Sequence, residues 1–186
     1  NGYGTPMNVY HTVRVFEEAG VAGVNIEDQI SPKRCGHMPG KEVVSLTEMV
    51  KKIEAACLAR RSDDFVVVAR TDALAVEGMD VMIARIRAYA EAGADMIFPD
   101  AVRAEDDIAR VVDASPIPVS INMGLGIRGR PTTPLIPMRR LKQLGVRRVS
   151  LPRMLPAAAI KGMRTALTVL RERMETDDST DRDDIV

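Results

Sequence analysis

The 186-residue sequence has no tryptophan, and its three phenylalanines and three tyrosines make up only 3% of the chain. It contains two cysteines, Cys35 and Cys57, and its 26 basic residues are balanced by 26 acidic ones. Two cysteines cannot build a disulfide framework, which predicts a reducing compartment: the cytoplasm, or the mitochondrial matrix in a eukaryote. No apolar run approaches the roughly 20 residues that span a bilayer, so no membrane partner is expected. The balanced charge also argues against a dedicated nucleic-acid binder.

Hydrophobic residues reach 46% with 11 methionines, which is enough for a core of packed helices and buried strands. The charge is unevenly placed, because residues 175–186 hold six acids and one arginine. Residues 1–174 are therefore mildly basic, as suits an enzyme that receives anionic substrates. We expect one domain over 1–174 and a disordered acidic tail over 175–186.

Strand-like and helical segments alternate along the chain. Gly20, Gly93 and Gly145 each end a helix just before a buried strand, where glycine supplies the left-handed helix end. This order predicts an α/β fold with parallel strands. The expected strands are 21–26, 65–69, 96–98, 118–123 and 146–151, and the expected helices are 6–19, 46–60, 79–92, 105–113, 137–144 and 156–174.

Polar residues gather where the strands end, at Glu27, Arg70, Asp100 and Asn122. Both a (β/α)₈ barrel and a doubly wound sheet place their ligand at the carboxyl ends of strands. The doubly wound sheet usually carries G-x-G-x-x-G after its first strand. In this sequence the motif occurs only over residues 124–129, near the end of the strand series and in front of a proline-rich loop. It does not indicate a dinucleotide site there.

The segment 26–37 contains the densest group of side chains that can take part in catalysis. It places a lysine, an arginine, a thiol, a glycine and a histidine within eleven residues of a strand-end acid. A thiol beside basic groups can exchange protons, and a glycine allows close backbone approach to a ligand. A solvated surface loop with an incidental cysteine would have the same composition, so both interpretations stand at this point.

The run Lys33-Arg34-Cys35-Gly36-His37 resembles a signature of the isocitrate lyase and phosphoenolpyruvate mutase superfamily. The resemblance is strongest to its 2-methylisocitrate lyase and 2,3-dimethylmalate lyase members, and it extends over residues 1 to about 170. It implies a (β/α)₈ TIM-type barrel, of which the chain would carry about the last five βα units. The other matching segments are 2–4, 26–29, 69–73, 97–101 and 133–135.

The resemblance also implies a Mg²⁺-dependent lyase, with Mn²⁺ as an alternative ion. Such an enzyme cleaves a carbon–carbon bond of a 2-hydroxy di- or tricarboxylate and yields a 2-oxo acid and a dicarboxylate. The metal would act as a Lewis acid on the oxygen that becomes the carbonyl. The implied roles are catalysis by Cys35, Lys33 and His37, substrate binding by Gly36, His37, Arg70, Asp100 and Asn122, and metal binding by Glu27 through a coordinated water.

The sequence departs from the resemblance at three points. It does not contain the D-x-D-x-G segment that supplies the superfamily's principal metal ligands. Asp100 stands where the lyases usually have glutamate, and the glycine-rich run after Asn122 replaces a more polar stretch. These departures leave two alternatives: an oxaloacetate decarboxylase or phosphoenolpyruvate mutase-type enzyme on the same scaffold, or a catalytically incomplete binding fragment. Cys35 favours the lyase, because the mutase and decarboxylase branches typically lack that thiol.

The last long helix carries Ile160, Met163, Leu167 and Leu170 on one face, and this face predicts a partner surface. The resemblance implies a homotetramer whose C-terminal helices are exchanged between subunits. Gln29 and Asp72 are expected to support the site from behind. Arg128 and Arg130 lie in a loop above a strand end and are candidates for contact with an anion.

Overall fold

A computed structural model describes residues 1–124 and 133–176, so Arg128, Arg130 and most of the predicted tail lie outside the described residues. The strands are β1 (Gly23–Glu27), β2 (Val66–Thr71), β3 (Met96–Pro99), β4 (Ser120–Asn122) and β5 (Arg148–Ser150). The helices are α1 (Pro6–Glu18), α2 (Leu46–Ala59), α3 (Leu74–Glu77), α4 (Met79–Glu91), α5 (Glu105–Ala114), α6 (Met138–Gln143) and α7 (Met154–Glu175).

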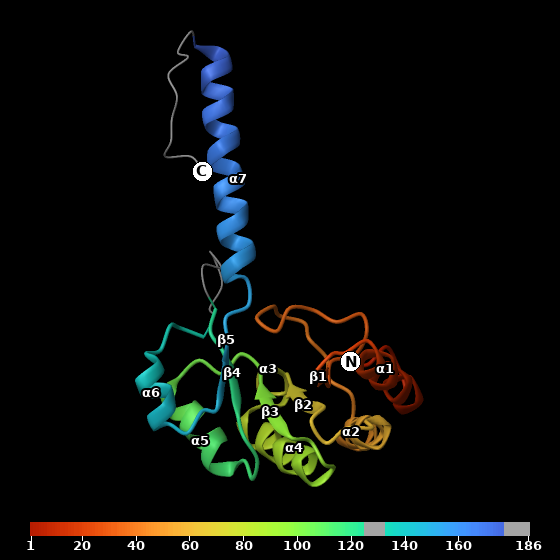
Figure 1. The fold of residues 1–186 in the computed structure, drawn as a ribbon. Coiled ribbons are helices and arrows are strands. Elements are labelled where there is room, and N and C mark those ends of the chain that lie inside the picture. Colours follow the sequence, from red (N-terminus) through yellow and green to blue (C-terminus); the bar gives the residue numbers. More distant parts are fainter. Residues whose placement is uncertain (125–132, 177–186) are drawn as a thin grey trace.

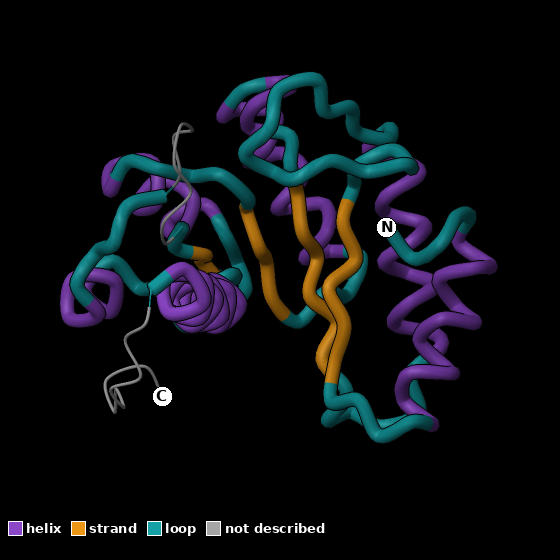
Figure 2. The backbone as a smooth tube through the Cα atoms, turned by 90° about the horizontal axis from the view of Figure 1, so that it is seen from above, coloured by secondary structure: helices purple, strands orange, loops and turns teal. Residues whose placement is uncertain are grey.

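The strands are parallel and neighbours in sequence are neighbours in space. β1, β2 and β3 form one sheet in that order, and β4 pairs with β5. A parallel bridge between Ile97 and Val119 joins β3 to β4, so the order β1 to β5 runs through both sheets. Figure 2 shows the strands at the centre with helices around them. The parallel α/β arrangement expected from the sequence is confirmed.

One hydrophobic core lies between the strands and the helices that cover them. It contains Ile53 of α2, Ile86 of α4 and Ile108 of α5, each 0% exposed. In β2 it includes Val67 and Ala69 and excludes Val68, which is also buried, because successive side chains of a strand point to opposite faces. The helices therefore cover one face of the strands, and the other face is left for the residues of the site.

The predicted helices are present, with ends shifted by one to two residues. Helix α3 was not predicted, because a four-residue helix without buried residues has no hydrophobic periodicity. Gly20, Gly93 and Gly145 have φ of 83°, 99° and 85°, which confirms the predicted left-handed helix ends. The β-branched run over 65–69 predicts a strand that is buried on both faces, and this prediction is wrong at Val66. That residue is 37% exposed because it starts the strand at the open end of the sheet.

The spacing of Ser45 and Glu48 predicts a reciprocal cap at the start of α2, and only half of it forms. The Ser45 hydroxyl accepts from the Glu48 backbone N–H at 3.1 Å, as predicted. The Glu48 carboxylate pairs instead with Lys52, one turn further along the helix, at 2.9 Å. An ion pair with a lysine that is 5% exposed outweighs a second bond to the backbone.

Helix α7 projects away from the rest of the described residues (Figure 1). It has no buried residue, and the predicted apolar face is open to solvent, with exposures between 55% and 64% at Ile160, Met163, Leu167 and Leu170. A face of this kind gains stability only when another surface covers it. Among the described helices, none is long and apolar enough to cross a membrane.

Replacing Ile86 by alanine should lower the free energy of unfolding by about 2–4 kcal/mol, because the cavity in the core cannot collapse fully. Val81, on the same helix and 41% exposed, is the matched control, and Val81→Ala should cost less than about 1 kcal/mol. Urea unfolding followed by circular dichroism measures both. Equal losses in the two variants would contradict the placement of this core.

Candidate active site

The register of the strands brings the predicted site residues to one edge of the sheet. Glu27 is the pairing partner of Arg70, and Arg70 is the partner of Phe98. Paired residues point to the same face, so these three side chains form a row. Asp100 follows β3 directly, and Asn122 is the last residue of β4. Strand ends therefore supply the floor of the site.

Arg70 is the centre of this row. Its Nε lies 2.8 Å from Asp72 Oδ2 and 3.1 Å from Glu27 Oε2, and its Nη2 lies 3.2 Å from Asp100 Oδ2. The guanidinium also lies 5.1 Å from the centre of the Phe98 ring, within range of a cation–π contact. Burial works against its charge, but these acids outweigh burial and raise the pKa of Arg70. The guanidinium is thus fixed in position and permanently charged.

Asp100 is held between a base and an amide. Asn122 Nδ2 donates to Asp100 Oδ1 at 3.1 Å, and the side chain of Asp100 is 2% exposed. Burial raises the pKa of Asp100 to about 6, with Arg70 opposing the shift and Asp72 adding to it. A buried carboxyl that titrates near neutrality can change its protonation when a ligand arrives.

The loop between β1 and α2 is pinned over these strand ends. Gln29 clasps it by donating to the Arg34 carbonyl at 3.0 Å and accepting from the Arg34 N–H at 2.9 Å. Lys41, with a side chain 2% exposed, donates to the Gly36 carbonyl at 2.6 Å and pairs with Asp72 at 3.0 Å. The pairing of Asp72 with Lys41 and with Arg70 outweighs burial and lowers the pKa of Asp72.

Gly36 lies against the floor of the site. A Cβ atom at this position would lie 1.5 Å from Asp100 Oδ2 and 2.8 Å from Arg70 Nη2. No side chain fits there without displacing both groups. The glycine of the predicted motif is therefore required by the close approach of the loop to the strand ends.

Asp28 ties the site to the helix layer. Its Oδ2 accepts from the Thr71 hydroxyl at 2.7 Å and from the Tyr89 hydroxyl at 2.9 Å, and its Oδ1 accepts from the Asp72 N–H at 2.9 Å. Arg85 lies 3.5 Å away. Burial raises the pKa of Asp28 even though these donors oppose the shift. This network fixes the end of β1 relative to β2 and α4.

A cavity of about 230 Å³ opens above Arg70 and holds most of the predicted site. Seven of the predicted site residues line it: Lys33, Cys35, Gly36, His37, Arg70, Asp100 and Asn122. Gly124, Pro152 and Arg153 complete the lining. Of the residues predicted for catalysis, substrate binding or metal binding, Glu27 is outside this lining, and its Oε2 lies 2.6 Å from Lys33 Nζ.

The thiol and the imidazole stand on the loop side of the cavity. Cys35 Sγ accepts from Arg153 Nη2 at 3.4 Å. Burial lowers the pKa of His37, and the charges of Lys41, Arg70 and Arg153 lower it further. The imidazole is therefore neutral at neutral pH. A thiol, a neutral imidazole and fixed cations can together move a proton beside a bound anion.

Glu27 fits the part of one metal ligand. Its Oε1 is buried and accepts no hydrogen bond from the described residues. Such an oxygen is suited to a hard cation or to a water that the cation carries. The residues described do not complete a metal centre, since they contain no group of three or more histidine, cysteine, aspartate or glutamate side chains that could hold an ion.

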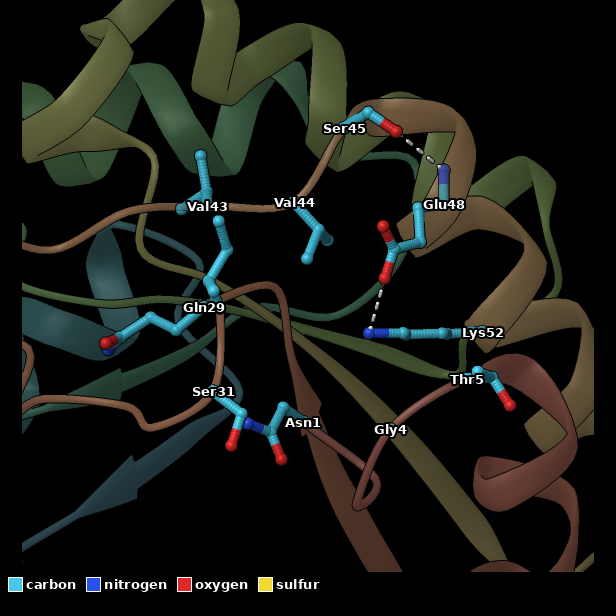
Figure 3. A pocket seen from close by; sticks show the side chains of 11 residues that line it. Asn1, Gly4, Thr5, Gln29, Ser31, Val43, Val44, Ser45, Glu48 and Lys52 are labelled. Carbon is cyan, nitrogen blue, oxygen red and sulfur yellow. Dashed lines mark hydrogen bonds and ion pairs between the residues drawn. The ribbon is translucent and has the colours of Figure 1, made fainter.

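A second cavity of about 470 Å³ lies beside β1 and α2 (Figure 3). Figure 3 shows the Lys52 side chain extending toward the Glu48 carboxylate, to which it is bonded at 2.9 Å. The charges of Lys52 and Glu48 neutralise each other, and the lining contains no thiol or imidazole. The smaller cavity, where the acid–base groups meet, is the better candidate for a reaction site.

Sequence reasoning missed Lys41 and Arg153. Arg153 follows the fifth strand, so the rule that strand ends carry the chemistry could have found it. Lys41 gives no such signal, because a lysine in a polar loop is ordinarily solvated. Gln29 and Asp72 do support the site through Arg34 and Arg70, as expected.

Comparisons with known proteins show the family to which the chain is similar. Residues 1–171 match the sequence model of a family described as phosphoenolpyruvate phosphomutase. A 2,3-dimethylmalate lyase of Eubacterium barkeri is 41% identical over 179 residues, which cover 96% of this chain and 59% of that protein. A probable 2-methylisocitrate lyase 2 of Corynebacterium glutamicum is 46% identical over 151 residues, which cover 81% of this chain and 48% of that protein.

The fold has close solved relatives as well. A structure of oxaloacetate acetylhydrolase in complex with 3,3-difluorooxalacetate aligns with a TM-score of 0.85 and 38% sequence identity, covering 91% of this chain and 57% of that one. The chain thus spans roughly half the length of the curated relatives it matches.

The raised pKa of Asp100 predicts how stability depends on pH. The folded state holds the proton that the unfolded state releases between its ordinary pKa of 3.8 and about 6. Stability from this group is therefore present at low pH and lost as pH rises through about 6. Between pH 4 and pH 7 the wild type should lose roughly 1–3 kcal/mol relative to Asp100→Asn.

Urea unfolding at several pH values measures this difference, with Asp106→Asn as the control at an exposed acid of α5. The control should follow the wild type at every pH. A difference between Asp100→Asn and wild type that stays constant, or that grows in the opposite direction, would show that burial does not dominate at Asp100.

Proposed function

Because the chain belongs to the phosphoenolpyruvate phosphomutase family, we propose that the protein is a carbon–carbon lyase. Its substrate is a 2-hydroxy di- or tricarboxylate of the 2-methylisocitrate or 2,3-dimethylmalate type. The products are a 2-oxo acid and a second carboxylate. The observation that carries the proposal is the position of Cys35, which lines one cavity with the strand-end residues Arg70, Asp100 and Asn122.

The floor of the cavity suits the part of the substrate that becomes the 2-oxo acid. A carboxylate at the Gly36–His37 turn would lie above the planar guanidinium of Arg70, which is held ready by the acids around it. Asn122 and Asp100 are bonded to each other and present an amide and a carboxyl to the same space. These groups bind and orient the substrate, and Lys33 polarises the oxygen on its reacting carbon.

The thiol of Cys35 supplies the proton that completes cleavage. When the carbon–carbon bond breaks, the hydroxyl oxygen gives its proton to solvent water and becomes the carbonyl of the 2-oxo acid. The electron pair of the broken bond goes to the carbon beside the departing carboxylate. Cys35 gives its proton to that carbon, and the thiolate regains a proton before the next turnover. His37, neutral at neutral pH, lines the same cavity and can assist this return.

We assign Mg²⁺, with Mn²⁺ as the alternative, to the side of the site where Glu27 Oε1 is buried without a hydrogen-bond partner among the described residues. When bound, the ion would act as a Lewis acid on the oxygen that becomes the carbonyl. Glu27 contributes one ligand position, directly or through a water. The described residues contain no group of three or more histidine, cysteine, aspartate or glutamate side chains that would complete the coordination.

The likeness to oxaloacetate acetylhydrolase, at 38% identity and a TM-score of 0.85, favours a second candidate. This is cleavage of a 2-oxo diacid such as oxaloacetate with water as the co-substrate. The same cavity serves either reaction, since both substrates carry two carboxylates on either side of the bond that breaks. Analysis of the products distinguishes them, and carbon dioxide release would indicate a decarboxylase.

Two further expectations belong to this proposal. The five βα units form part of a closed eight-stranded barrel, as the coverage of 57% of the solved relative suggests. The exposed apolar face of α7 packs against another subunit of a homo-oligomer, for which a tetramer is the expected form. The cytoplasmic location, with the mitochondrial matrix as the alternative, stays a prediction from the cysteine content.

Replacing Cys35 by serine should lower kcat by at least about 100-fold with little change in KM, because a hydroxyl is a far weaker proton donor than a thiol. Turnover of 2-methylisocitrate and 2,3-dimethylmalate, followed by the 2-oxo acid formed, measures this. Cys57→Ser is the matched control, since Cys57 lies on α2 away from the cavity. Wild-type turnover in Cys35→Ser would refute the proton-donor role.

Replacing Glu27 by glutamine should raise the Mg²⁺ concentration that gives half-maximal activity by about 10-fold or more, because the amide removes one negative charge from the ion's surroundings. A Mg²⁺ titration of activity measures the change. Glu48→Gln, which removes a carboxylate bonded to Lys52, should titrate like the wild type. Identical titrations for Glu27→Gln and wild type would argue against the assignment of Glu27.

A further inference from the structure

One buried cation of α4 has no part in the proposed reaction. Arg85 is 3% exposed, and it is not among the residues that line the cavity of about 230 Å³. Its Nε donates to Glu77 Oε2 at 2.8 Å, and its Nη1 donates to the Tyr89 hydroxyl at 3.1 Å and lies 3.5 Å from Asp28 Oδ2. Its Nη2 donates to the Val44 carbonyl at 3.0 Å. Every nitrogen of this guanidinium therefore has a partner.

Two of these partners lie at the two ends of one loop. Asp28 follows β1 directly, and Val44 lies just before the residue that caps α2. The Val44 N–H donates to the Asp28 carbonyl at 2.8 Å, and Gln29 and Val43 form an antiparallel bridge beside this bond. These four residues form the base of the loop, from which the segment 31–41 extends with its thiol. The guanidinium thus contacts both sides of the loop base.

We propose that Arg85 is a positioning residue, which holds both sides of the loop base against α4 and so keeps Cys35 in place at the cavity. The inference rests on the proposed lyase function. A guanidinium suits this task because its planar fork binds two acceptors at once, whereas an ammonium is a single point charge. Because the guanidinium is buried, water does not replace a contact that is lost.

The surroundings of Arg85 fix the guanidinium itself. Arg85 lies next to Ile86 and one turn before Tyr89, on the face of α4 that is buried in the core. Glu77, just before α4, binds Nε from the solvent side with a side chain that is 34% exposed. The loop base is therefore attached to a helix that the core holds in place, as well as to the strands.

The position of the loop base matters for catalysis because proton transfer needs a short distance between donor and acceptor. Displacement of a reacting group by about 1 Å can cost about 100-fold in rate. Lys41 binds the Gly36 carbonyl and Asp72, so it holds the tip of the loop. Arg85 holds the base, and loss of its fork lets the base turn and displaces Cys35.

Limited proteolysis measures the position of the loop in Arg85→Lys, which keeps the charge and loses the fork. Trypsin cuts an ordered loop only when the loop opens, so cleavage after Lys33 or Arg34 reports the opening of this segment. This cleavage should be at least about 5-fold faster than in the wild type. Cleavage after Lys51 or Lys52, inside α2, reports opening of the whole fold and should change less than about 2-fold.

The same variant should turn over 2-methylisocitrate more slowly. We expect kcat to fall by about 10-fold or more, because Cys35 no longer stays within reach of the carbon that it protonates. KM should change less than kcat, since Arg70 and Asn122 bind the substrate from the strand ends. Mass spectrometry of the tryptic fragments and steady-state kinetics give the two readouts.

Two other variants of α4 serve as controls. Arg87→Gln removes an exposed arginine that donates to the Ala114 carbonyl, and it should match the wild type in both readouts. Tyr89→Phe removes a hydroxyl of the same network but leaves the bond between Arg85 and Val44. It should therefore accelerate cleavage of the loop less than Arg85→Lys does. A role in stability alone would make these two network variants alike.

Glu77→Gln takes the place of Arg85→Lys if that variant does not fold. The Glu77 side chain is partly exposed, so its replacement should leave the fold intact, and circular dichroism checks this. The amide binds Nε more weakly than the carboxylate, so cleavage of the loop should be at least about 2-fold faster. Cleavage of the loop at the wild-type rate in Glu77→Gln would then overturn the role of Arg85.

The outcomes separate this inference from the function on which it rests. If the wild type cleaves its substrate and Arg85→Lys keeps the wild-type kcat and loop cleavage, the role of Arg85 is overturned and the lyase function stands. Equal acceleration of cleavage in the loop and in α2 would also overturn it, because Arg85 would then stabilise only the fold. If the wild type cleaves neither 2-methylisocitrate nor 2,3-dimethylmalate, the proposed function fails, and cleavage of the loop still tests the hold of Arg85.

Discussion

The site depends on the charge of Arg70 and on the three carboxylates that surround it. Each carboxylate comes from the end of a neighbouring parallel strand or the residues just after it, at Glu27, Asp72 and Asp100. None of these buried charges would be tolerated alone, since an unpaired ion in the interior costs several kcal/mol. The positive charge of the Arg70 guanidinium therefore makes it possible for three carboxylates to lie close together at one edge of the sheet. The same arrangement leaves Asp100 with a pKa of about 6 and Glu27 with a buried oxygen that lacks a partner among the described residues.

A second constraint is the close approach of the loop that carries the thiol. Gly36 leaves no room for a side chain above Asp100, and Lys41 fixes the Gly36 carbonyl while it neutralises Asp72. The loop and the strand ends thus share their charges and cannot move independently. This explains how a surface segment of polar composition becomes one wall of a defined cavity. It also places Cys35 where Arg153, from the far end of the chain, can reach it.

The sequence predicted the elements well because their signals are local. Glycine after a helix, β-branched runs and strand-end polar residues each depend on a few neighbouring positions, and they located the strands and the row from Glu27 to Asn122. What the sequence could not reveal depends on long-range contacts. Three examples are contacts between residues 31 to 118 positions apart: Lys41 with Asp72, Asp28 with Tyr89, and Cys35 with Arg153. The choice of Lys52 rather than the backbone as the partner of Glu48 was equally hidden, because it depends on how deeply that lysine is buried.

The most direct test of the central claim is proton NMR of the protein with Mg²⁺ and 2-methylisocitrate in deuterated water. The account predicts that pyruvate and succinate appear in equal amounts, and that succinate carries one deuterium on the carbon that receives its proton from Cys35. Signals of a decarboxylated acid in place of pyruvate and succinate would contradict it. So would a folded, Mg²⁺-loaded protein that leaves both 2-methylisocitrate and 2,3-dimethylmalate unchanged.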